Sequence, residues 1–299
     1  MIAMLGEAVI DFIGGTGRED QPCFYHYVGG CALNAATAAS RLDADVLFIG
    51  KLSGDMFGSQ MCRHFESNGV EMIPRLCGAA ENSMLGFASF DAQGSASYAF
   101  YSQGTVVTTL KEQEITEVLD ERQDISYLHI GSVSVAFESS GSQILQALKK
   151  RKRLPTVLFD PNVRPTIITD FTAYRKRVIE LIWLTTLVKL SHEDLELIFP
   201  ELSHEEGVKR ILELGAAHVI LTKGKDGLAW ISREGESVEV PAIDNPIADT
   251  IGAGDTVSGA ILAYLEEHQI GSSDIVSAQQ MREALQFAAL AAAVTTSRK

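Results

Sequence analysis

The segment NPIADTIGAGDTVSGAIL contains three glycines and two aspartates directly before an apolar run. Apolar residues of the run recur at helical spacing, which places Gly252, Ala253 and Gly254 in the first turn of a predicted helix. Free amides at a helix start attract an anion, and glycine lets a phosphate group approach the backbone closely. Asp255 follows in the same turn, where its carboxylate is placed to accept a proton from an attacking hydroxyl. The segment therefore predicts a phosphoryl-transfer centre.

This glycine segment has other interpretations. Its glycines can form an ordinary turn, with Asp255 stabilising the helix start. Two common nucleotide motifs do not fit. The sequence has no GxxxxGK[ST] loop, and the Rossmann spacing fails because Pro246 precedes the loop and Gly259 comes too late. The missing Rossmann spacing argues against a dinucleotide-dependent oxidoreductase.

A second group of residues suits a sugar. Asp11 follows the predicted strand MLGEAVID, and a carboxylate accepts two hydrogen bonds from vicinal hydroxyls. Gly29 and Gly30 allow close backbone approach, and Asn34, one turn into the following helix, offers both a donor and an acceptor. The alternatives are a salt-bridged surface aspartate for Asp11 and an ordinary polar helix residue for Asn34.

The segment FDPNVRP places Asp160, Asn162 and Arg164 just past a predicted strand, at the edge where open α/β sheets bind ligands. The guanidinium of Arg164 is suited to support a phosphate or a sugar. An ion pair between Arg164 and Asp160 is the structural alternative.

Short apolar runs alternate with amphipathic stretches along the chain, as in folds where buried strands alternate with helices. The predicted strands are IAML, VLFIG, YLHIG, TVLFD, TLVKL and HVILTKG, and the predicted helices span 32–42, 57–67, 139–152, 173–184 and 204–214. This repetition predicts an α/β fold with a parallel sheet between two helix layers. A hairpin, DGLAWISREGESVEV, is expected before the glycine segment.

Two stretches, 9–28 and 85–107, alternate polar and apolar residues around Gly and Asp turns, which is typical of antiparallel strands with one wet face. Such a flap exposes an apolar face unless it closes over a ligand or pairs with a copy of itself. We therefore expect residues 1–299 to form a single domain that carries a small β-strand lid.

The composition of the chain limits the kinds of partner that we expect it to bind. The chain has 25 Lys and Arg against 39 Asp and Glu, a net charge of −14, which opposes binding along a nucleic acid. No apolar run approaches the ~18 residues needed to span a bilayer, and the first residues lack the basic region of a secretory signal. The four cysteines show no CxxC pair and no metal-ligand spacing. A cytoplasmic protein with small-molecule ligands, and neither nucleic acid nor membrane as partner, is expected.

These motifs also carry a resemblance to a family. DTIGAGDTVSGA resembles the C-terminal signature of the ribokinase-like (PfkB) carbohydrate kinases at every fixed position of the DTxGAGD core. YVGGCALNAATAASRL, followed by GKLSGDMFG, resembles their N-terminal motif. With GEAVIDF, FDPNVR and LTKGKDG, the resemblance covers essentially the whole chain. It implies a three-layer α/β/α ribokinase-like core with a mostly parallel sheet, a small β-strand lid, and an ATP-dependent sugar kinase.

The resemblance assigns roles to individual residues. Asp255 is implied as the general base, and the amides of Gly252, Ala253 and Gly254 as groups that stabilise the transferring phosphoryl group. The implied substrate-binding residues are Asp11, Gly29, Gly30, Asn34, Phe100 and Arg164. The implied ATP-binding residues are Thr222, Lys223, Gly224 and Gly227, with Ala288 near the adenine on the last predicted helix. Core packing is the alternative for that apolar helix face, and Lys225 is expected to be exposed to solvent.

Metal ions are implied as well. Magnesium is the expected cofactor because the β- and γ-phosphates of ATP need their charge neutralised. Where the family shows NxxE, whose glutamate organises magnesium through water, this chain has Ser191 and Asp194. The carbonyls of Asp249 and Ile251 are the implied site of a monovalent cation, K⁺.

The motifs GEAVIDF and VKLSHEDLE resemble bacterial fructokinases more than ribokinase or adenosine kinase. Phe100 and Tyr101 are followed by Ser102 and Gln103, where fructokinase-like chains often carry an arginine, so the lid suits an unphosphorylated sugar. The expected reaction moves the γ-phosphate of ATP to a primary sugar hydroxyl, most simply of fructose, in a homodimer formed through the lid. Another sugar, a riboside such as aminoimidazole riboside, and a non-catalytic sensor of the same fold are the alternatives. A sensor would be expected to lack Asp255.

Overall fold

The fold is built on one large sheet. The computed structural model describes residues 1–90, 96–271 and 276–298. Within these ranges nine strands form the sheet, in the spatial order β15 (Ser237–Val240), β14 (Leu228–Ser232), β13 (His218–Thr222), β12 (Leu187–Ser191), β11 (Thr156–Asp160), β10 (Tyr127–Gly131), β1 (Ile2–Leu5), β4 (Val46–Ile49) and β6 (Glu71–Met72). All neighbours from β13 to β6 pair in parallel, and the β14–β15 hairpin, expected from the sequence, adds two antiparallel strands at one edge.

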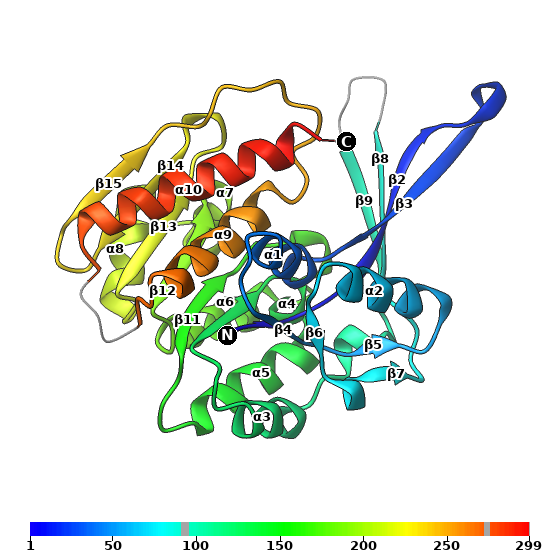
Figure 1. The fold of residues 1–299 in the computed structure, drawn as a ribbon, viewed down its shortest axis with the longest axis horizontal. Helices are drawn as coiled ribbons and strands as arrows, with labels where there is room; N and C mark the ends of the chain where they lie inside the picture. The colour runs from blue at the N-terminus through cyan, green and yellow to red at the C-terminus, as the bar shows by residue number, and fades with distance from the viewer. Residues whose placement is uncertain (91–95, 272–275, 299) are drawn as a thin grey trace.

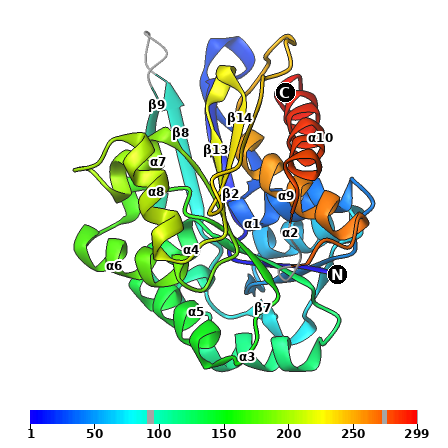
Figure 2. The same ribbon diagram turned by 90° about the vertical axis from the view of Figure 1, so that its left-hand side faces the viewer.

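Helices cover both faces of this sheet (Figure 2). One layer contains α1 (Cys31–Ser40), α2 (Met56–Ser67), α9 (Ala253–Glu267) and α10 (Ala278–Thr296). The other contains α3 (Glu112–Glu121), α4 (Val133–Ala136), α5 (Glu138–Lys150), α6 (Phe171–Ile182), α7 (His192–Ile198) and α8 (His204–Leu214). This arrangement confirms the three-layer α/β/α core with a mostly parallel sheet. The short elements are η1 (Arg18–Asp20), η2 (Pro74–Leu76), η3 (Val106–Thr108), η4 (Pro165–Ile167), η5 (Gly224–Asp226), β5 (Leu52–Ser53) and β7 (Cys77–Ala79).

The two faces of the sheet bury separate hydrophobic cores. In β1, Ile2 and Met4 pack beneath α1 and α9, whereas Ala3 and Leu5 pack on the opposite side. Because side chains alternate along a strand, a strand covered on both faces is apolar at every position. The continuous apolar runs of the sequence therefore become the central strands.

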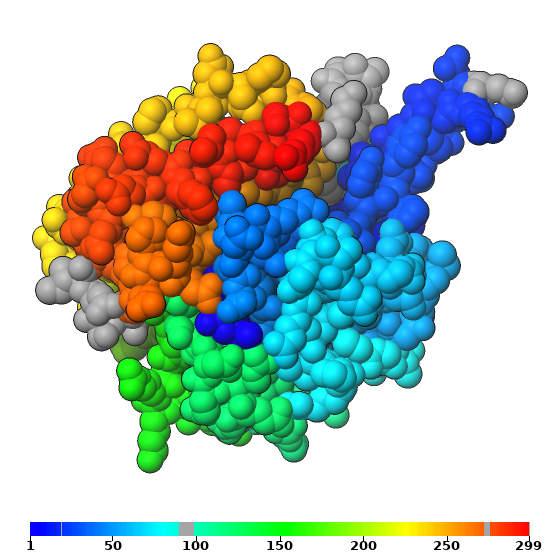
Figure 3. Space-filling model, viewed as in Figure 1, coloured from blue at the N-terminus to red at the C-terminus, as the bar shows by residue number. Residues whose placement is uncertain are grey.

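A second sheet rises from the body (Figure 1). Four described strands form it, in the order β3 (Pro22–Gly29), β2 (Val9–Thr16), β8 (Leu85–Phe90) and β9 (Ala96–Tyr101). β2 pairs in parallel with β8, which differs from an entirely antiparallel flap. The β2–β3 hairpin stands clear of the body in the space-filling view (Figure 3). Residues 91–95 of the expected second segment lie outside the described residues, and Val106 and Val107, at its expected end, are buried in the main core.

The carboxyl ends of β1, β10, β11, β12 and β13 meet at one edge of the main sheet. β1 has β4 on one side and β10 on the other, so the strand order reverses at this point. Open α/β sheets bind ligands in the crevice outside such a reversal. Within the described ranges, none of the helices combines the length and the apolar composition that crossing a bilayer requires.

Candidate active site

The glycine segment forms the start of α9. Gly252 precedes the helix with φ +76°, a left-handed conformation that glycine adopts without strain. No side chain of the described residues caps this helix, whereas α2, α6, α7, α8 and α10 each begin at an Asp or Ser whose side chain accepts backbone amides. The amide of Ala253 donates within the turn to the Thr250 carbonyl over 3.3 Å. The uncapped turn leaves α9 with the electropositive end that an anion requires.

Asp255 lies in this turn and is 7% exposed. Both of its carboxylate oxygens accept an amide. Asn34, on α1, donates to Oδ2 over 2.8 Å, and Asn162, after β11, donates to Oδ1 over 3.3 Å. Asn162 has φ +35°, in the left-handed region that asparagine tolerates better than most residues. The two amides fix the orientation of the carboxylate while leaving lone pairs free to accept a proton.

Sequence reasoning gave Asn162 no role of its own. It lay beside Asp160 and Arg164 in FDPNVRP, and the positive φ that turns its amide toward α9 cannot be read from the residue type. The signal that could have identified it is an asparagine within two residues of a strand's carboxyl end, facing the predicted base.

Asp11 lies on β2 between two glycines. A Cβ at Gly29 would lie 2.2 Å from its Oδ2, and a Cβ at Gly86 would lie 2.7 Å from its Oδ1. Only glycines at these positions leave room for the carboxylate. Burial raises the pKa of Asp11 to about 6, with Arg164 lowering it and Asp255 raising it. Asp11 therefore shares one electrostatic environment with Arg164 and Asp255.

Gly30 introduces α1 with φ +102°, and a Cβ there would lie 2.8 Å from the Glu7 carbonyl oxygen. The side chain of Glu7 is fully buried and accepts the Cys31 amide at 3.2 Å on Oε1. Its Oε2 accepts the Ser134 amide at 2.9 Å and the Ser134 hydroxyl at 2.6 Å. Burial raises the pKa of Glu7, and these hydrogen bonds oppose the increase. Glu7, which the sequence analysis did not single out, thus fixes the start of α1 and hence Asn34.

Arg164 and Phe100 border the same edge. Arg164 is exposed, its Nη1 donates to the carbonyls of Asn162 and Val163, each over 3.3 Å, and it forms no ion pair within the described part of the chain. The alternative pairing with Asp160 is wrong, because Lys189 occupies that carboxylate. Phe100 lies opposite Gly86 across the β8–β9 pair, and a Cβ at Gly86 would be 3.1 Å from its ring.

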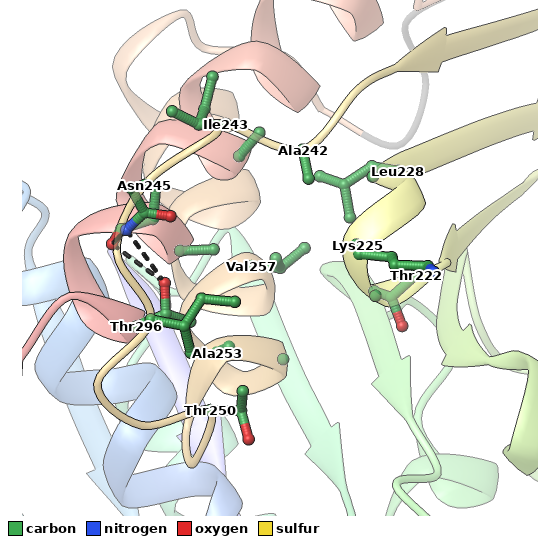
Figure 4. Close-up of a pocket in the computed structure, with 17 residues that line it drawn as sticks. Thr222, Lys225, Leu228, Ala242, Ile243, Asn245, Thr250, Ala253, Val257 and Thr296 are labelled. Carbon is green, nitrogen blue, oxygen red and sulfur yellow. Dashed lines mark hydrogen bonds between the residues drawn. The ribbon is translucent and has the colours of Figure 1, made fainter.

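A pocket of about 350 Å³ opens beside the start of α9 (Figure 4). Its wall is mostly apolar and comes from four places: the loop after β13, the segment 242–250, the start of α9, and α10. The lining residues are Thr222, Gly224, Lys225, Gly227, Leu228, Ala242, Ile243, Asn245, Ile247, Thr250, Ala253, Gly254, Val257, Ala289, Ala292, Ala293 and Thr296. Because Ala253 and Gly254 belong to this wall, the pocket ends at the turn that carries Asp255.

The expected ATP-binding residues are placed differently from one another. Thr222, Gly224 and Gly227 line the pocket, whereas Lys223 pairs with Glu239 over 2.5 Å. Lys225 is exposed, as expected, and also borders the pocket. Ala288 is fully buried in the core, and the pocket is lined by its neighbours on α10, Ala289, Ala292 and Ala293.

The expected metal residues are engaged with the protein. Asp194 accepts the Val163 amide at 2.7 Å on Oδ1, and its Oδ2 accepts the Ser191 amide at 2.9 Å and hydroxyl at 3.0 Å. With both oxygens occupied, Asp194 does not fit a direct metal ligand; it holds the loop that carries Arg164. Asp249 and Ile251 are exposed, and Oδ1 of Asp249 accepts the Ile251 amide at 2.9 Å.

The end of α10 holds the segment before the glycine turn. The Thr296 carbonyl accepts the amides of Ala248 and Asp249 over 2.7 and 3.2 Å. Asn245 donates to the Ala293 carbonyl over 2.7 Å (Figure 4). The approach to the turn is therefore fixed by the last helix.

Comparisons with known proteins identify the family and the fold. The sequence pattern of the pfkB family carbohydrate kinases matches residues 1–299. A fructokinase of Rhizobium leguminosarum bv. trifolii is 29% identical over 267 residues, which cover 89% of this chain and 80% of the relative. The fructokinase of Xylella fastidiosa with bound ATP superposes with a TM-score of 0.89 and 23% identity, over 100% of this chain and 92% of that one. The fructokinase of Vibrio cholerae O395 in its fructose, ADP and calcium ion bound form superposes with a TM-score of 0.83 and 24% identity. The match covers 100% of this chain and 93% of that one. At these identities the two structural comparisons establish a shared fold.

Proposed function

Because the chain belongs to the pfkB family of carbohydrate kinases, and is thus a phosphotransferase that acts on an alcohol group, we propose that it transfers the γ-phosphate of ATP to a primary hydroxyl of fructose. The observation that carries this proposal is the position of Asp255. It lies where the pocket bounded by Ala253 and Gly254 meets the edge that presents Asn34 and, nearby, Asp11. The relatives named above, both by sequence and by fold, are fructokinases.

In this proposal the sugar lies over α1. Asp11 accepts hydrogen bonds from sugar hydroxyls, the backbone at Gly29 and Gly30 allows close approach, and Asn34 contributes its remaining donor and acceptor. Phe100 supplies an apolar wall. Arg164, a nearby cation that forms no ion pair among the described residues, supports the phosphate that is transferred.

ATP occupies the apolar pocket. Its adenine packs against Ala289, Ala292 and Ala293, next to Ala288, and its ribose and phosphates follow Thr222, Gly224 and Gly227 toward α9. Lys223 acts by shaping this loop: its side chain is paired with Glu239, and its amide donates to the Gly227 carbonyl over 2.8 Å. The γ-phosphate then meets the amides of Gly252, Ala253 and Gly254 at the positive end of the helix.

The chemistry follows from this placement. Asp255 accepts the proton of the attacking hydroxyl, the sugar oxygen forms a bond to the γ-phosphorus, and the bond to the bridging oxygen breaks to release ADP. The turn amides stabilise the charge that develops on the phosphoryl group. Asn34 and Asn162 keep the carboxylate of Asp255 directed at the hydroxyl. Closure of the lid excludes water, which would otherwise compete as acceptor.

Magnesium is the proposed divalent cofactor, and it supplies charge neutralisation at the β- and γ-phosphates. Asp194 does not fit a direct ligand, so we propose that the phosphates themselves and water would hold the ion, with Asp194 ordering the neighbouring loop.

The carbonyls of Asp249 and Ile251 are the proposed site of K⁺. Turnover in KCl exceeding turnover in tetramethylammonium chloride supports that site, and equal turnover contradicts it.

The lid supports a proposed homodimer. Phe24, Tyr25, Tyr27 and Tyr101 are between 50% and 65% exposed on its strands, more aromatic surface than a flap facing only water requires. Sedimentation equilibrium measures the mass of the particle, which distinguishes a dimer from a monomer.

We also propose that the protein works in the cytoplasm, which supplies ATP and keeps thiols reduced. The cysteines of this chain are free.

The function is tested by ADP release from MgATP with fructose, glucose, ribose, adenosine and aminoimidazole riboside as acceptors. We expect kcat/KM for fructose to exceed the others by at least about tenfold. If a riboside had the highest kcat/KM, the protein would still be a kinase, but the riboside would replace fructose as its proposed substrate. ATP binding without ADP release from any acceptor would instead support the sensor.

Asp255→Asn is expected to bind sugar and ATP while kcat falls by about 10² to 10⁴. Asp45→Asn, at an exposed acid on the opposite edge of the sheet, is the matched control. Normal turnover in Asp255→Asn would remove the proposed base.

A further inference from the structure

A buried ion pair lies beneath the start of α9. Lys189 Nζ, from β12, lies 2.8 Å from Oδ2 of Asp160, at the end of β11. The two side chains are 5% and 0% exposed. Lys189 is the charged residue of an otherwise apolar strand segment, LVKL. None of the roles derived above uses this pair.

The pair is oriented along the helix. A Cβ built on Gly254 would lie 3.0 Å from Lys189 Nζ, so the ammonium contacts the second residue of α9. Ser258, one turn further along α9, donates to Oδ2 of Asp160 over 3.0 Å. Gly254 and Ser258 are separated by about 6 Å along the helix axis. The positive end of the ion pair therefore lies under the first turn and the negative end under the second, parallel to the helix dipole.

The surrounding groups leave Lys189 as the positive charge of this cluster. Burial lowers the pKa of Lys189, but the charge and hydrogen bond of Asp160, with the charge of Asp255, raise it overall above its usual value. Burial lowers the pKa of His129, on β10, so that imidazole is neutral at pH 7. Burial also raises the pKa of Cys31 well above its usual value, which keeps the thiol protonated.

Stability alone gives little reason for such a pair. Burying two charges carries a desolvation cost for each, and well-packed apolar residues commonly stabilise a core as well or better. The space under Gly254 is instead filled by the ammonium group of Lys189, which extends from β12 and is held by Asp160 at the end of β11.

We propose that Lys189 is a positioning residue of phosphoryl transfer: anchored by Asp160, it supports the Gly254 backbone and places a fixed positive charge behind the amides that receive the phosphoryl group. This rests on the proposed function. A charge fixed before the reaction acts on the developing negative charge without reorganisation, in a site of low dielectric. It also explains why residue 254 has no side chain on the inner side of the turn.

The test removes both charges together, in Lys189→Met/Asp160→Asn, so that neither is left unpaired. We expect a folded protein by circular dichroism whose kcat falls about ten- to hundredfold while KM for the sugar changes less than about threefold. The control is Arg177→Met/Glu138→Gln, which removes an ion pair with a buried arginine from the other helix layer. It is expected to affect the melting temperature and leave kcat within about twofold. A folded Lys189→Met/Asp160→Asn protein with kcat within about threefold of the wild type would overturn the proposal.

A binding measurement separates this proposal from the proposed function. Calorimetry with MgADP and with MgADP–aluminium fluoride, a mimic of the transferring phosphoryl group, needs no turnover. The double variant is expected to lose at least tenfold in affinity for the mimic and less than about threefold for MgADP. Equal losses would overturn the role of Lys189 even if fructose proves to be the wrong acceptor.

If the double variant fails to fold, Lys189→Arg and Lys189→Gln replace it. Lys189→Arg keeps the positive charge and Lys189→Gln removes it. The arginine variant is expected to bind the mimic at least about tenfold more tightly than the glutamine variant. Equal affinities would overturn the proposal.

Discussion

The side-chain amide of Asn34 donates to Oδ2 of Asp255 over 2.8 Å, so the first turns of α1 and α9 are joined through their functional groups. The helices approach closely here because Gly259 has no side chain: a Cβ would lie 2.5 Å from the Ala35 carbonyl oxygen. The amide that we propose to contact the sugar is thus also an amide that orients the base. In that proposal, sugar binding and the orientation of Asp255 are coupled through one residue, Asn34.

Asn162→Gly tests the second side-chain amide that donates to Asp255, the proposed base. Glycine adopts the positive φ of residue 162 without strain, so the change removes mainly the hydrogen bond to Oδ1 of Asp255. We expect kcat to fall about tenfold, as for loss of one hydrogen bond to a charged group, with sugar KM nearly unchanged. Asp43→Gly, at another positive φ, is the control for backbone effects in the same steady-state assay. An unchanged kcat would show that Asn34 alone orients the base.

The affinity for the sugar is expected to depend on pH through Asp11. Its pKa is raised to about 6 by burial, so the carboxylate that we propose to accept sugar hydroxyls is lost as pH falls through this value. Sugar affinity measured by calorimetry should therefore rise from pH 5 to pH 7. Arg164 lowers this pKa, so Arg164→Gln should move the inflection upward, whereas Arg210→Gln, on α8, should not. An affinity independent of pH over this range would exclude Asp11 from sugar binding.

Asp11→Asn should lose sugar binding and gain stability. A carboxyl whose pKa is higher in the folded state than in the unfolded state weakens folding once it ionises, so its contribution falls between about pH 4 and pH 6 and stays low above. The neutral amide avoids this cost, which is of the order of 1–3 kcal/mol at pH 7. Urea unfolding of the two proteins at pH 7 and pH 4 measures the difference, which should vanish at the lower pH. A variant less stable than the wild type at pH 7 would contradict this reasoning.

Gly29→Ala is expected to raise the sugar KM at least tenfold with little change in ATP affinity. The new Cβ would lie 2.2 Å from Oδ2 of Asp11 and must displace that carboxylate. Gly54→Ala, where the nearest atom would be 3.4 Å away, controls for the effect of adding a methyl group. Sugar and nucleotide titrations followed by tryptophan fluorescence distinguish the two ligands. Equal effects of the two alanines would contradict a specific role for Gly29.

Ala289→Leu should act on the nucleotide alone. The larger side chain enters the pocket of about 350 Å³ from α10, and we expect the Kd of MgATP to rise about tenfold. Leu290→Ala, on the exposed side of the same helix, is the control, and sugar affinity should be unchanged in both. A normal Kd in Ala289→Leu would place the adenine elsewhere.

Much of the fold follows from local patterns. The predicted strands reappear as β1, β4, β10, β11, β12 and β13, since strands buried on both faces are apolar throughout. α3 was not anticipated. The parallel pairing of β2 with β8 was also missed, because it joins residues far apart in the sequence and is not fixed by alternation within either strand.

The site could be predicted less completely. The helical spacing of the apolar residues identified the turn that contains Gly252, Gly254 and Asp255, because a helix start needs few residues to define it. Lys189 was read only as part of the apolar strand TLVKL, although a single lysine in such a strand needs a buried partner. Asn162 and Glu7 act through positive φ and through contacts between distant elements, and neither property is visible in a local pattern.

The hold of α10 on the segment before the catalytic turn has a consequence for biosynthesis. Asp11 and Asn34 leave the ribosome early, whereas the carbonyl that fixes the amides of Ala248 and Asp249 belongs to Thr296. A domain generally folds as a unit during synthesis. The segment before Asp255 is secured only after Thr296 has left the ribosome, so chains truncated before the last turn of α10 should turn over no ATP even though Asp11 and Asn34 are present.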